Sequence, residues 1–164
     1  MLSAKMEKAL NEQINKELFS SYLYRSMSAY YESVNLPGFA AYFNVQADEE
    51  HAHALKIYSH VHTRGGRVTL EAIEKPQAEW NGALDGLKAA YAHEQFITNS
   101  IHSLVDLALE LKDHATNQFL QWFVEEQVEE EESALTLVTK LEMIGESKNS
   151  LYLFDRDMGK RAAK

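Results

Sequence analysis

The sequence predicts an all-α fold: a four-helix bundle with a long crossover between its second and third helices and a short fifth helix. Only two prolines and seven glycines interrupt the 164 residues, which favours a few long helices over many short strands. Apolar side chains recur with helical spacing along four long segments. Between the second and third segments lie roughly 18 residues with little helical pattern, from Gly66 to Ala83.

Proline and glycine indicate most of the helix boundaries. Pro37 and Gly38 follow the first segment and end it, and Gly65 and Gly66 end the second. Gly145 ends the fourth segment. The expected helices are residues 3–34, 39–66, 84–112, 114–144 and 149–161, all within a single domain of residues 1–164.

Loop lengths predict how these helices are connected. About four residues join the first helix to the second, and one or two join the third to the fourth, so each pair should form an antiparallel hairpin. The segment before the third helix can extend over ~55–60 Å at ~3.3 Å per residue. A helix of about 28 residues is only ~42 Å long. The loop can therefore cross the whole bundle and leave the second and third helices parallel.

Each long helix has an inward-facing stripe that is apolar at its ends and polar near its middle. A bundle held together only by packing has no reason to adopt this pattern. Several buried carboxylates would repel one another or take up protons, and bound cations remove that penalty. The converging residues are Glu17, Glu50, His53, Glu94, Gln127 and Glu130.

Glu50 and His53 form a Glu-x-x-His motif, which presents an oxygen and a nitrogen ligand one turn apart on the same helix face. The motif occurs by chance in many helices, so the prediction rests on its combination with glutamates from the other three helices. Cysteine is absent, which excludes disulfides and thiolate sites. Carboxylate and imidazole ligands point to iron, manganese or zinc.

Some residues of this cluster allow a simpler interpretation. Glu17 and Glu94 would be ordinary solvated helix residues if their stripes did not also contain apolar side chains. Tyr24 lies near the polar cluster and is either a hydrogen-bond partner or a redox-active residue. The remaining histidines are interpreted as surface or packing residues: His51, His60, His62, His93, His102 and His114.

Six glutamates occupy residues 125–132. Most such runs are solvated faces. Glu126, Glu129 and Glu130 nevertheless lie on adjoining faces of one helix, and Glu49 directly precedes Glu50 on another. These residues could line a second acidic pocket that serves an additional iron.

Five segments resemble the bacterial and archaeal non-haem ferritins in residue type and spacing, and the resemblance covers essentially the whole chain. They are NEQINKELFSSYLYRSMS, ADEEHAHALKIY, RGGRV, AHEQFIT and FLQWFVEEQVEEEESA. The resemblance implies a ferritin-like bundle that assembles as a homo-oligomeric cage of about 24 subunits, with the short fifth helix near the four-fold axes. It also implies ferroxidase activity, in which Fe(II) is oxidised by O2 or H2O2 and stored as ferric mineral.

The same resemblance implies roles for individual residues. One iron is bound by three residues, of which Glu50 bridges to the second iron, and Tyr24 is the tyrosine beside the centre. The ligands of the first iron are Glu17, Glu50 and His53. The ligands of the second iron are Glu50, Glu94 and Glu130, with Gln127 close by. A third iron site is implied at Glu49, Glu126, Glu129 and Glu130.

Two differences from the bacterioferritins indicate that this chain is not expected to bind haem. Bacterioferritins carry a second Glu-x-x-His on the fourth helix, where this chain reads Gln127-x-x-Glu130. They bind haem through a methionine within the first motif, where this chain has His51 and Ala52.

Composition limits the remaining classes of function. A net charge of −9 disfavours nucleic-acid binding and suits a surface that attracts cations. No stretch approaches the ~20 apolar residues of a membrane span, and a cytoplasmic location is expected. Two alternatives stay open: a di-metal oxidase or peroxide-scavenging enzyme on the same bundle without mineral storage, and a non-enzymatic helical scaffold with hydrated core glutamates.

Overall fold

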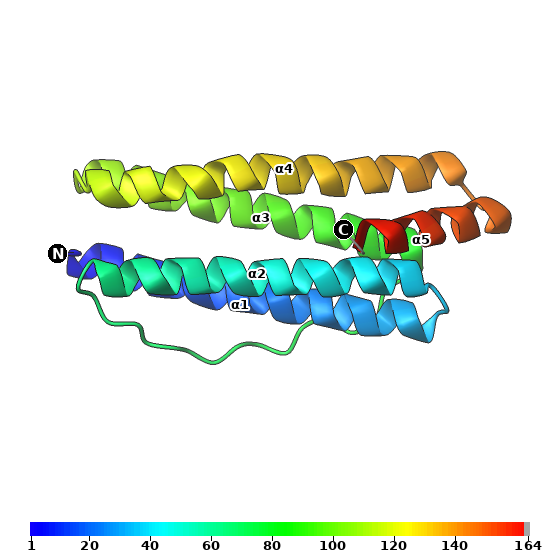
Figure 1. The fold of residues 1–164 in the computed structure, drawn as a ribbon, viewed down its shortest axis with the longest axis horizontal. Helices are drawn as coiled ribbons and strands as arrows, with labels where there is room; N and C mark the ends of the chain where they lie inside the picture. The colour runs from blue at the N-terminus through cyan, green and yellow to red at the C-terminus, as the bar shows by residue number, and fades with distance from the viewer. Residues whose placement is uncertain (163–164) are drawn as a thin grey trace.

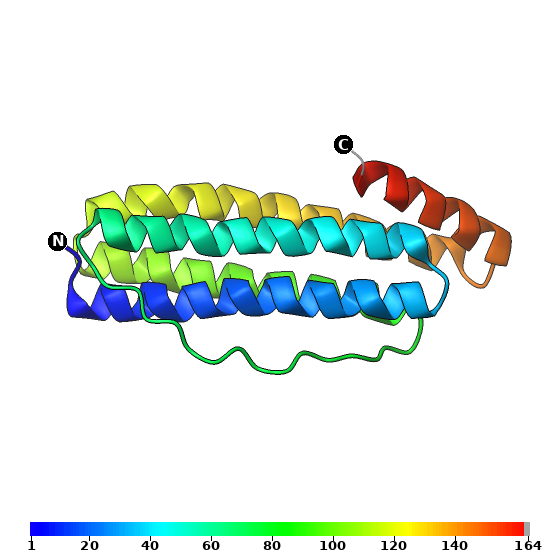
Figure 2. The ribbon, with the colours of Figure 1, turned by 60° about the horizontal axis from the view of Figure 1, so that its bottom comes forward.

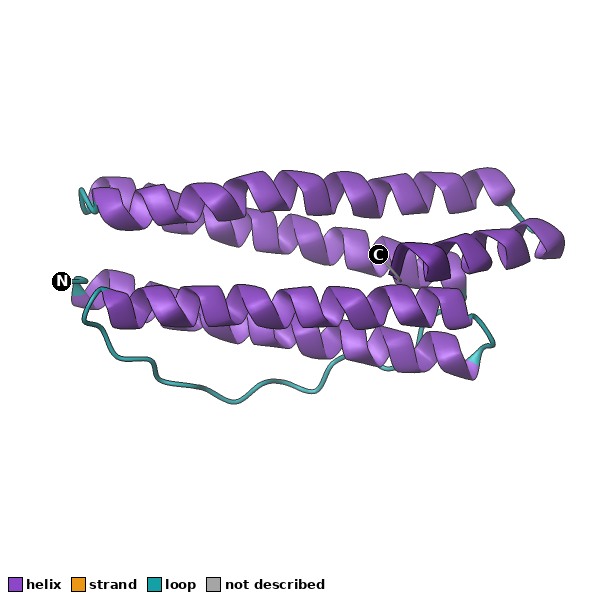
Figure 3. Ribbon diagram, in the orientation of Figure 1, coloured by secondary structure: helices purple, strands orange, loops and turns teal. Residues whose placement is uncertain are grey.

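The computed structural model describes residues 1–162, which contain five helices and no strand (Figure 1, Figure 3). The helices are α1 (Ala4–Ser33), α2 (Pro37–Thr63), α3 (Ala83–Glu110), α4 (His114–Ile144) and α5 (Lys148–Ala162). None of the helices in this range is long and apolar enough to cross a membrane. The predicted fold class is confirmed, whereas the assignment of residues 1–164 to a single domain stays a prediction.

Three of the long helices end in the same way. Each is followed by one residue with left-handed backbone: Asn35 (φ 61°), Gly65 (φ 72°) or Lys112 (φ 53°). The amide of the next residue then donates back to a carbonyl five positions earlier, as Gly66 does to Val61 at 2.9 Å. This closure ends α2 at Thr63 and α3 at Glu110, before the predicted residues 66 and 112. The start of α2 is earlier than the predicted residue 39, because Pro37 suits the first turn, where its missing N–H leaves no helical bond unmade.

Residues 64–82 form the crossover, which runs along α1 from one end of the bundle to the other (Figure 1, Figure 2). Helices α2 and α3 are therefore parallel, as the loop length predicts. Side chains of α1 hold the crossover through its backbone. The Asn11 amide donates to the Arg67 carbonyl at 2.9 Å, and the Tyr30 hydroxyl donates to the Trp80 carbonyl at 2.9 Å. The crossover thus has a fixed path although it contains no helix.

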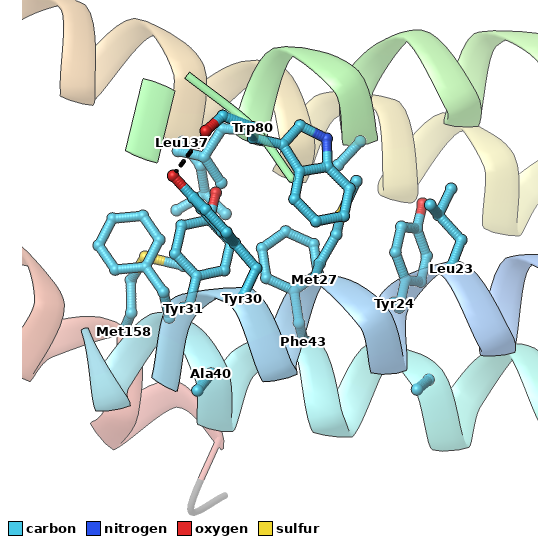
Figure 4. Close-up of a cluster of buried hydrophobic side chains, with 14 of the residues drawn as sticks. Leu23, Tyr24, Met27, Tyr30, Tyr31, Ala40, Phe43, Trp80, Leu137 and Met158 are labelled. Atoms are coloured by element: carbon cyan, nitrogen blue, oxygen red, sulfur yellow. Dashed lines mark hydrogen bonds between the residues drawn. The ribbon is translucent and has the colours of Figure 1, made fainter. Parts of the chain in front are cut away.

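The core consists of two apolar clusters separated by a polar layer. The cluster nearer α5 is rich in aromatic rings, and Tyr31 and Phe43 stack in it with centroids 5.4 Å apart (Figure 4). The opposite end is filled mainly by aliphatic side chains, with Phe123 among them. Every long helix contributes to both clusters, so the middle of each helix lies between two dry ends.

Helix α5 packs on the start of α2 through an unusually close backbone contact. The Asp155 carboxylate accepts a hydrogen bond from the Phe39 amide at 3.0 Å. A Cβ atom added at Gly38 would lie 1.7 Å from the Asp155 carbonyl oxygen, so only glycine fits there. Met158 of α5 is 1% exposed as a result of this packing.

Replacing Gly38 by alanine should detach α5 while leaving the four-helix bundle folded. We expect the free energy of unfolding to fall by about 2 kcal/mol, the order of magnitude for exposing a buried methionine side chain. Thermal unfolding and limited proteolysis of the C-terminal segment would measure the loss. Gly159→Ala is the matched control, because its added Cβ would meet Gly38 Cα at an ordinary 3.4 Å. Equal stability of the two variants would contradict this account of the contact.

Candidate metal centre

Three helices bring four residues of the predicted cluster into the polar layer. Glu17 lies on α1, Glu50 and His53 lie one turn apart on α2, and Glu94 lies on α3. All four residues are at most 5% exposed. One ligand atom from each of Glu17, Glu50 and His53 can be chosen so that the three lie within 4.8 Å of one another.

Several ligand atoms in this cluster have no hydrogen-bond partner within the protein. Five buried side-chain atoms of the described residues lack a hydrogen bond, and four of them are here: Glu17 Oε2, both Glu50 oxygens and His53 Nδ1. Leaving a buried polar atom without a partner normally costs about 1–3 kcal/mol. Four such atoms facing one volume form a set of hard oxygen and imidazole nitrogen donors, which fits Fe(II) and Fe(III).

The electrostatics of the centre require a proton or a cation. Burial raises the pKa of Glu17 well above its usual range, and the negative charge of Glu50 adds to the effect. The pKa of Glu50 is likewise raised, first by burial and then by Glu94. Burial, with Glu94 as the next contribution, raises the pKa of Glu130 to about 8. A cation bound among these groups would relieve both the repulsion and the desolvation.

The second half of the centre is hydrogen-bonded within the protein. Glu94 accepts at one oxygen from the Tyr24 hydroxyl and at the other from Gln127 Nε2, which is 3.1 Å away. Glu130 accepts from Gln46 Nε2 at 3.0 Å. Burial raises the pKa of Tyr24 well above its usual value, so this hydroxyl keeps its proton and remains a donor. Of the two roles open for Tyr24, the hydrogen bond is present in the structure, and the redox role stays a prediction.

The acidic residues expected beside the centre surround a common pocket. This open pocket of about 260 Å³ is also lined by Tyr42 and Ser133. Glu49 and Glu129 are exposed, whereas Glu130 is partly buried and also belongs to the inner cluster. The pocket is lined by all four residues of the expected third site: Glu49, Glu126, Glu129 and Glu130.

Gln46 and two further residues near the centre, Gln13 and His93, were not assigned to it from the sequence. Gln13 donates from Nε2 to Glu17 Oε1 at 2.7 Å, and its place one turn before Glu17 on the same helix face is a signal that could have revealed it. His93 is largely buried, shares a 2.7 Å hydrogen bond with Ser20 and lies against the Tyr24 ring. Burial lowers the pKa of His93 to about 4, so it packs as a neutral ring, consistent with a packing role.

Comparisons with known proteins agree with this geometry. Residues 7–144 match the ferritin-like domain of the ferritin family. The bacterial non-heme ferritin of Staphylococcus aureus strain USA300 is 38% identical over 161 residues, which cover 98% of this chain and 97% of that protein. The corresponding protein of Staphylococcus epidermidis is 39% identical over 162 residues, with 99% and 98% covered.

Solved structures give the same result. An open-pore ferritin from the hyperthermophilic archaeon Archaeoglobus fulgidus superposes with a TM-score of 0.96 at 48% identity, covering 97% of this chain and 98% of that one. A form of that ferritin engineered to be closed has the same TM-score and identity, with 97% of each chain covered. The chain belongs to the ferritin family and is similar to its bacterial and archaeal non-haem members.

Proposed function

We propose that this protein is an iron-storage ferritin that oxidises Fe(II) at the buried centre and retains the product as ferric mineral inside an oligomeric shell. The observation that carries the proposal is the group of unpaired, buried ligand atoms on Glu17, Glu50 and His53. Membership of the ferritin family supports storage as the outcome.

The proposed centre binds two Fe(II) ions as substrates. One takes Glu17 Oε2, a Glu50 oxygen and His53 Nδ1, all of which lack hydrogen-bond partners. Because both Glu50 oxygens are free, that carboxylate can also reach a second ion held by Glu94 and Glu130. Gln127 lies beside this second position and keeps Glu94 oriented through its hydrogen bond. Each Fe(II) gives up one electron, and the two electrons reduce O2 or H2O2.

The protein's own residues favour this oxidation in a simple way. Anionic carboxylates stabilise Fe(III) more than Fe(II), because the interaction grows with the charge of the cation. Tyr24 holds Glu94 by donating its hydroxyl proton, and burial keeps that proton in place. The apolar clusters on both sides limit water at the centre, which strengthens the electrostatic interactions there.

The acidic pocket beside the centre offers a route between the buried site and the solvent. We propose that Glu49, Glu126 and Glu129 bind an additional iron there and that Glu130 is shared with the inner cluster. Iron leaving the centre would then enter the cavity of a homo-oligomer of about 24 subunits. A cytoplasmic location and iron as the metal, without haem, complete the proposal.

Removing a ligand should abolish fast iron oxidation. The assay adds Fe(II) in air to the metal-free protein. Glu50→Ala and His53→Ala should each lower the initial rate of Fe(II) oxidation by more than about tenfold. Even loss of a hydrogen-bond partner of a metal ligand typically lowers metal affinity or activity by a factor of about 10–100. Absorbance of the ferric product would measure the rate. His51→Ala is the matched control, because this exposed histidine lies on the same helix within the same segment.

The outcomes separate the proposal from its alternatives. Rapid oxidation followed by large soluble iron loading supports a storage ferroxidase. Oxidation that stops at a few irons per subunit would instead favour a di-metal oxidase or peroxide-scavenging enzyme. A rate no faster than oxidation in buffer, unchanged in the two ligand variants, would favour a non-enzymatic scaffold.

The metal-free protein should lose stability as the pH rises from about 4.5 to about 8. The folded carboxyl groups have raised pKa values, so the native state binds more protons than the unfolded state between about pH 4.5 and pH 8. For each unit by which folding raises such a pKa within this range, the free energy of unfolding falls by about 1.4 kcal/mol as the pH rises. Urea unfolding in the presence of a chelator would measure the change.

Glu50→Gln supplies the comparison for this pH experiment, because it removes one titrating carboxyl group and also the charge that helps to raise the pKa of Glu17. The stability of this variant should depend less steeply on pH than that of the wild type. A control at the exposed Glu125, Glu125→Gln, should follow the wild-type curve. Parallel curves for wild type and Glu50→Gln would show that Glu50 does not hold a proton in the folded state.

A further inference from the structure

Gln13 is a buried amide that contacts the metal centre from outside its set of ligands. It is 1% exposed and lies on α1 one turn before Glu17. Its Nε2 donates to Glu17 Oε1 at 2.7 Å, so that oxygen already has a partner. The other oxygen, Glu17 Oε2, has none.

A chain of hydrogen bonds fixes the orientation of this amide. Lys16 Nζ donates to Ser100 Oγ at 2.6 Å, and Ser100 Oγ donates to Gln13 Oε1 at 2.6 Å. A lysine ammonium can only donate, so the serine hydroxyl has its own proton available for the Gln13 oxygen. The amide nitrogen of Gln13 then faces Glu17. Turning the amide over would give up the bond from the Ser100 hydroxyl and place the Gln13 oxygen against an oxygen of the Glu17 carboxylate.

The consequence is that the three central carboxylates differ in which oxygens are available. Glu50 has two unpaired oxygens, and Glu94 has a donor on each of its oxygens. Glu17 is intermediate, with one oxygen held and one free. The hydrogen bond from Gln13 therefore selects which Glu17 atom is offered to a cation and limits rotation of the carboxylate.

We propose that Gln13, supported by Ser100 and Lys16, is a positioning residue that makes Glu17 a one-oxygen ligand through Oε2. This inference rests on the metal centre proposed above. Gln13, Lys16 and Ser100 also line an open groove of about 380 Å³ between α1 and α3, although Gln13 itself is almost fully buried. Hydrogen-bond partners of metal ligands typically control both the orientation and the affinity of the site.

Cobalt(II) titration of the metal-free protein tests this role without relying on oxidation. Gln13→Met keeps the length of the side chain and removes the donor. We expect about tenfold weaker Co(II) binding and weaker visible absorption bands per bound ion, because a freely rotating Glu17 can bind through both oxygens and raise the coordination number. Ser100→Ala keeps the Gln13–Glu17 bond but releases its far end, and should cause a smaller change in the same direction.

Ser103→Ala is the matched control, since this hydroxyl lines the same groove but donates only to the Asn99 carbonyl, at 2.9 Å. It should bind Co(II) with the affinity and band intensity of the wild type. If Gln13→Met and Ser100→Ala also match the wild type in both quantities, the positioning role is wrong. A loss of thermal stability with unchanged Co(II) spectra would likewise reduce Gln13 to a structural residue.

Three further cases complete the test. If Gln13→Met does not fold, Ser100→Ala alone decides by the same two quantities. If Glu50→Ala abolishes Co(II) binding and Gln13→Met leaves it unchanged, the proposed role of Gln13 is wrong and the metal centre stands. Failure of the wild type to bind Co(II) at all overturns the centre and, with it, the role of Gln13.

Discussion

The burial of several carboxylates within one volume is the constraint on which the rest of this structure depends. Glu17, Glu50 and Glu94 are each at most 2% exposed, and an isolated charge at such depth is strongly disfavoured. The fold can hold them there because two apolar clusters, one on each side, keep the four helices in register. The metal-free protein tolerates the cluster through raised pKa values and donated hydrogen bonds, and a cation would replace both.

Hydrogen bonds at the centre also join the two helical hairpins. Tyr24 of α1 donates to Glu94 of α3, and Gln46 of α2 donates to Glu130 of α4. These bonds cross between the α1–α2 pair and the α3–α4 pair, which are otherwise connected along the chain by the crossover at residues 64–82. The polar layer is therefore part of the packing of the bundle as well as the place where metal is expected to bind.

The sequence could predict the fold and the identity of the clustered residues because both depend on spacing along single helices. Glu50 and His53 share a face by their separation alone, and the length of the crossover determines the direction of α3. Spacing could not show that Glu94 has donors on both oxygens, since these bonds come from other helices. The Gln13–Glu17 bond lies within α1, and its separation of four residues is a signal that spacing does contain. Helix ends were missed at α2 and α3 because the left-handed residue that closes each helix lies inside the predicted range.

Metal binding at this centre must stabilise the native bundle, and storage limits how strong that binding can be. A ligand present at about 100 times its dissociation constant adds roughly 2.7 kcal/mol to the stability of the state that binds it. An ion held much more tightly would stay at the centre and block further turnover. The hydrogen bonds now accepted by Glu94 and Glu130 would weaken binding at the proposed second position, because a metal would have to replace them. Glu130 lines both a small cavity next to Glu94 and the open acidic pocket, so it lies between the proposed centre and the solvent.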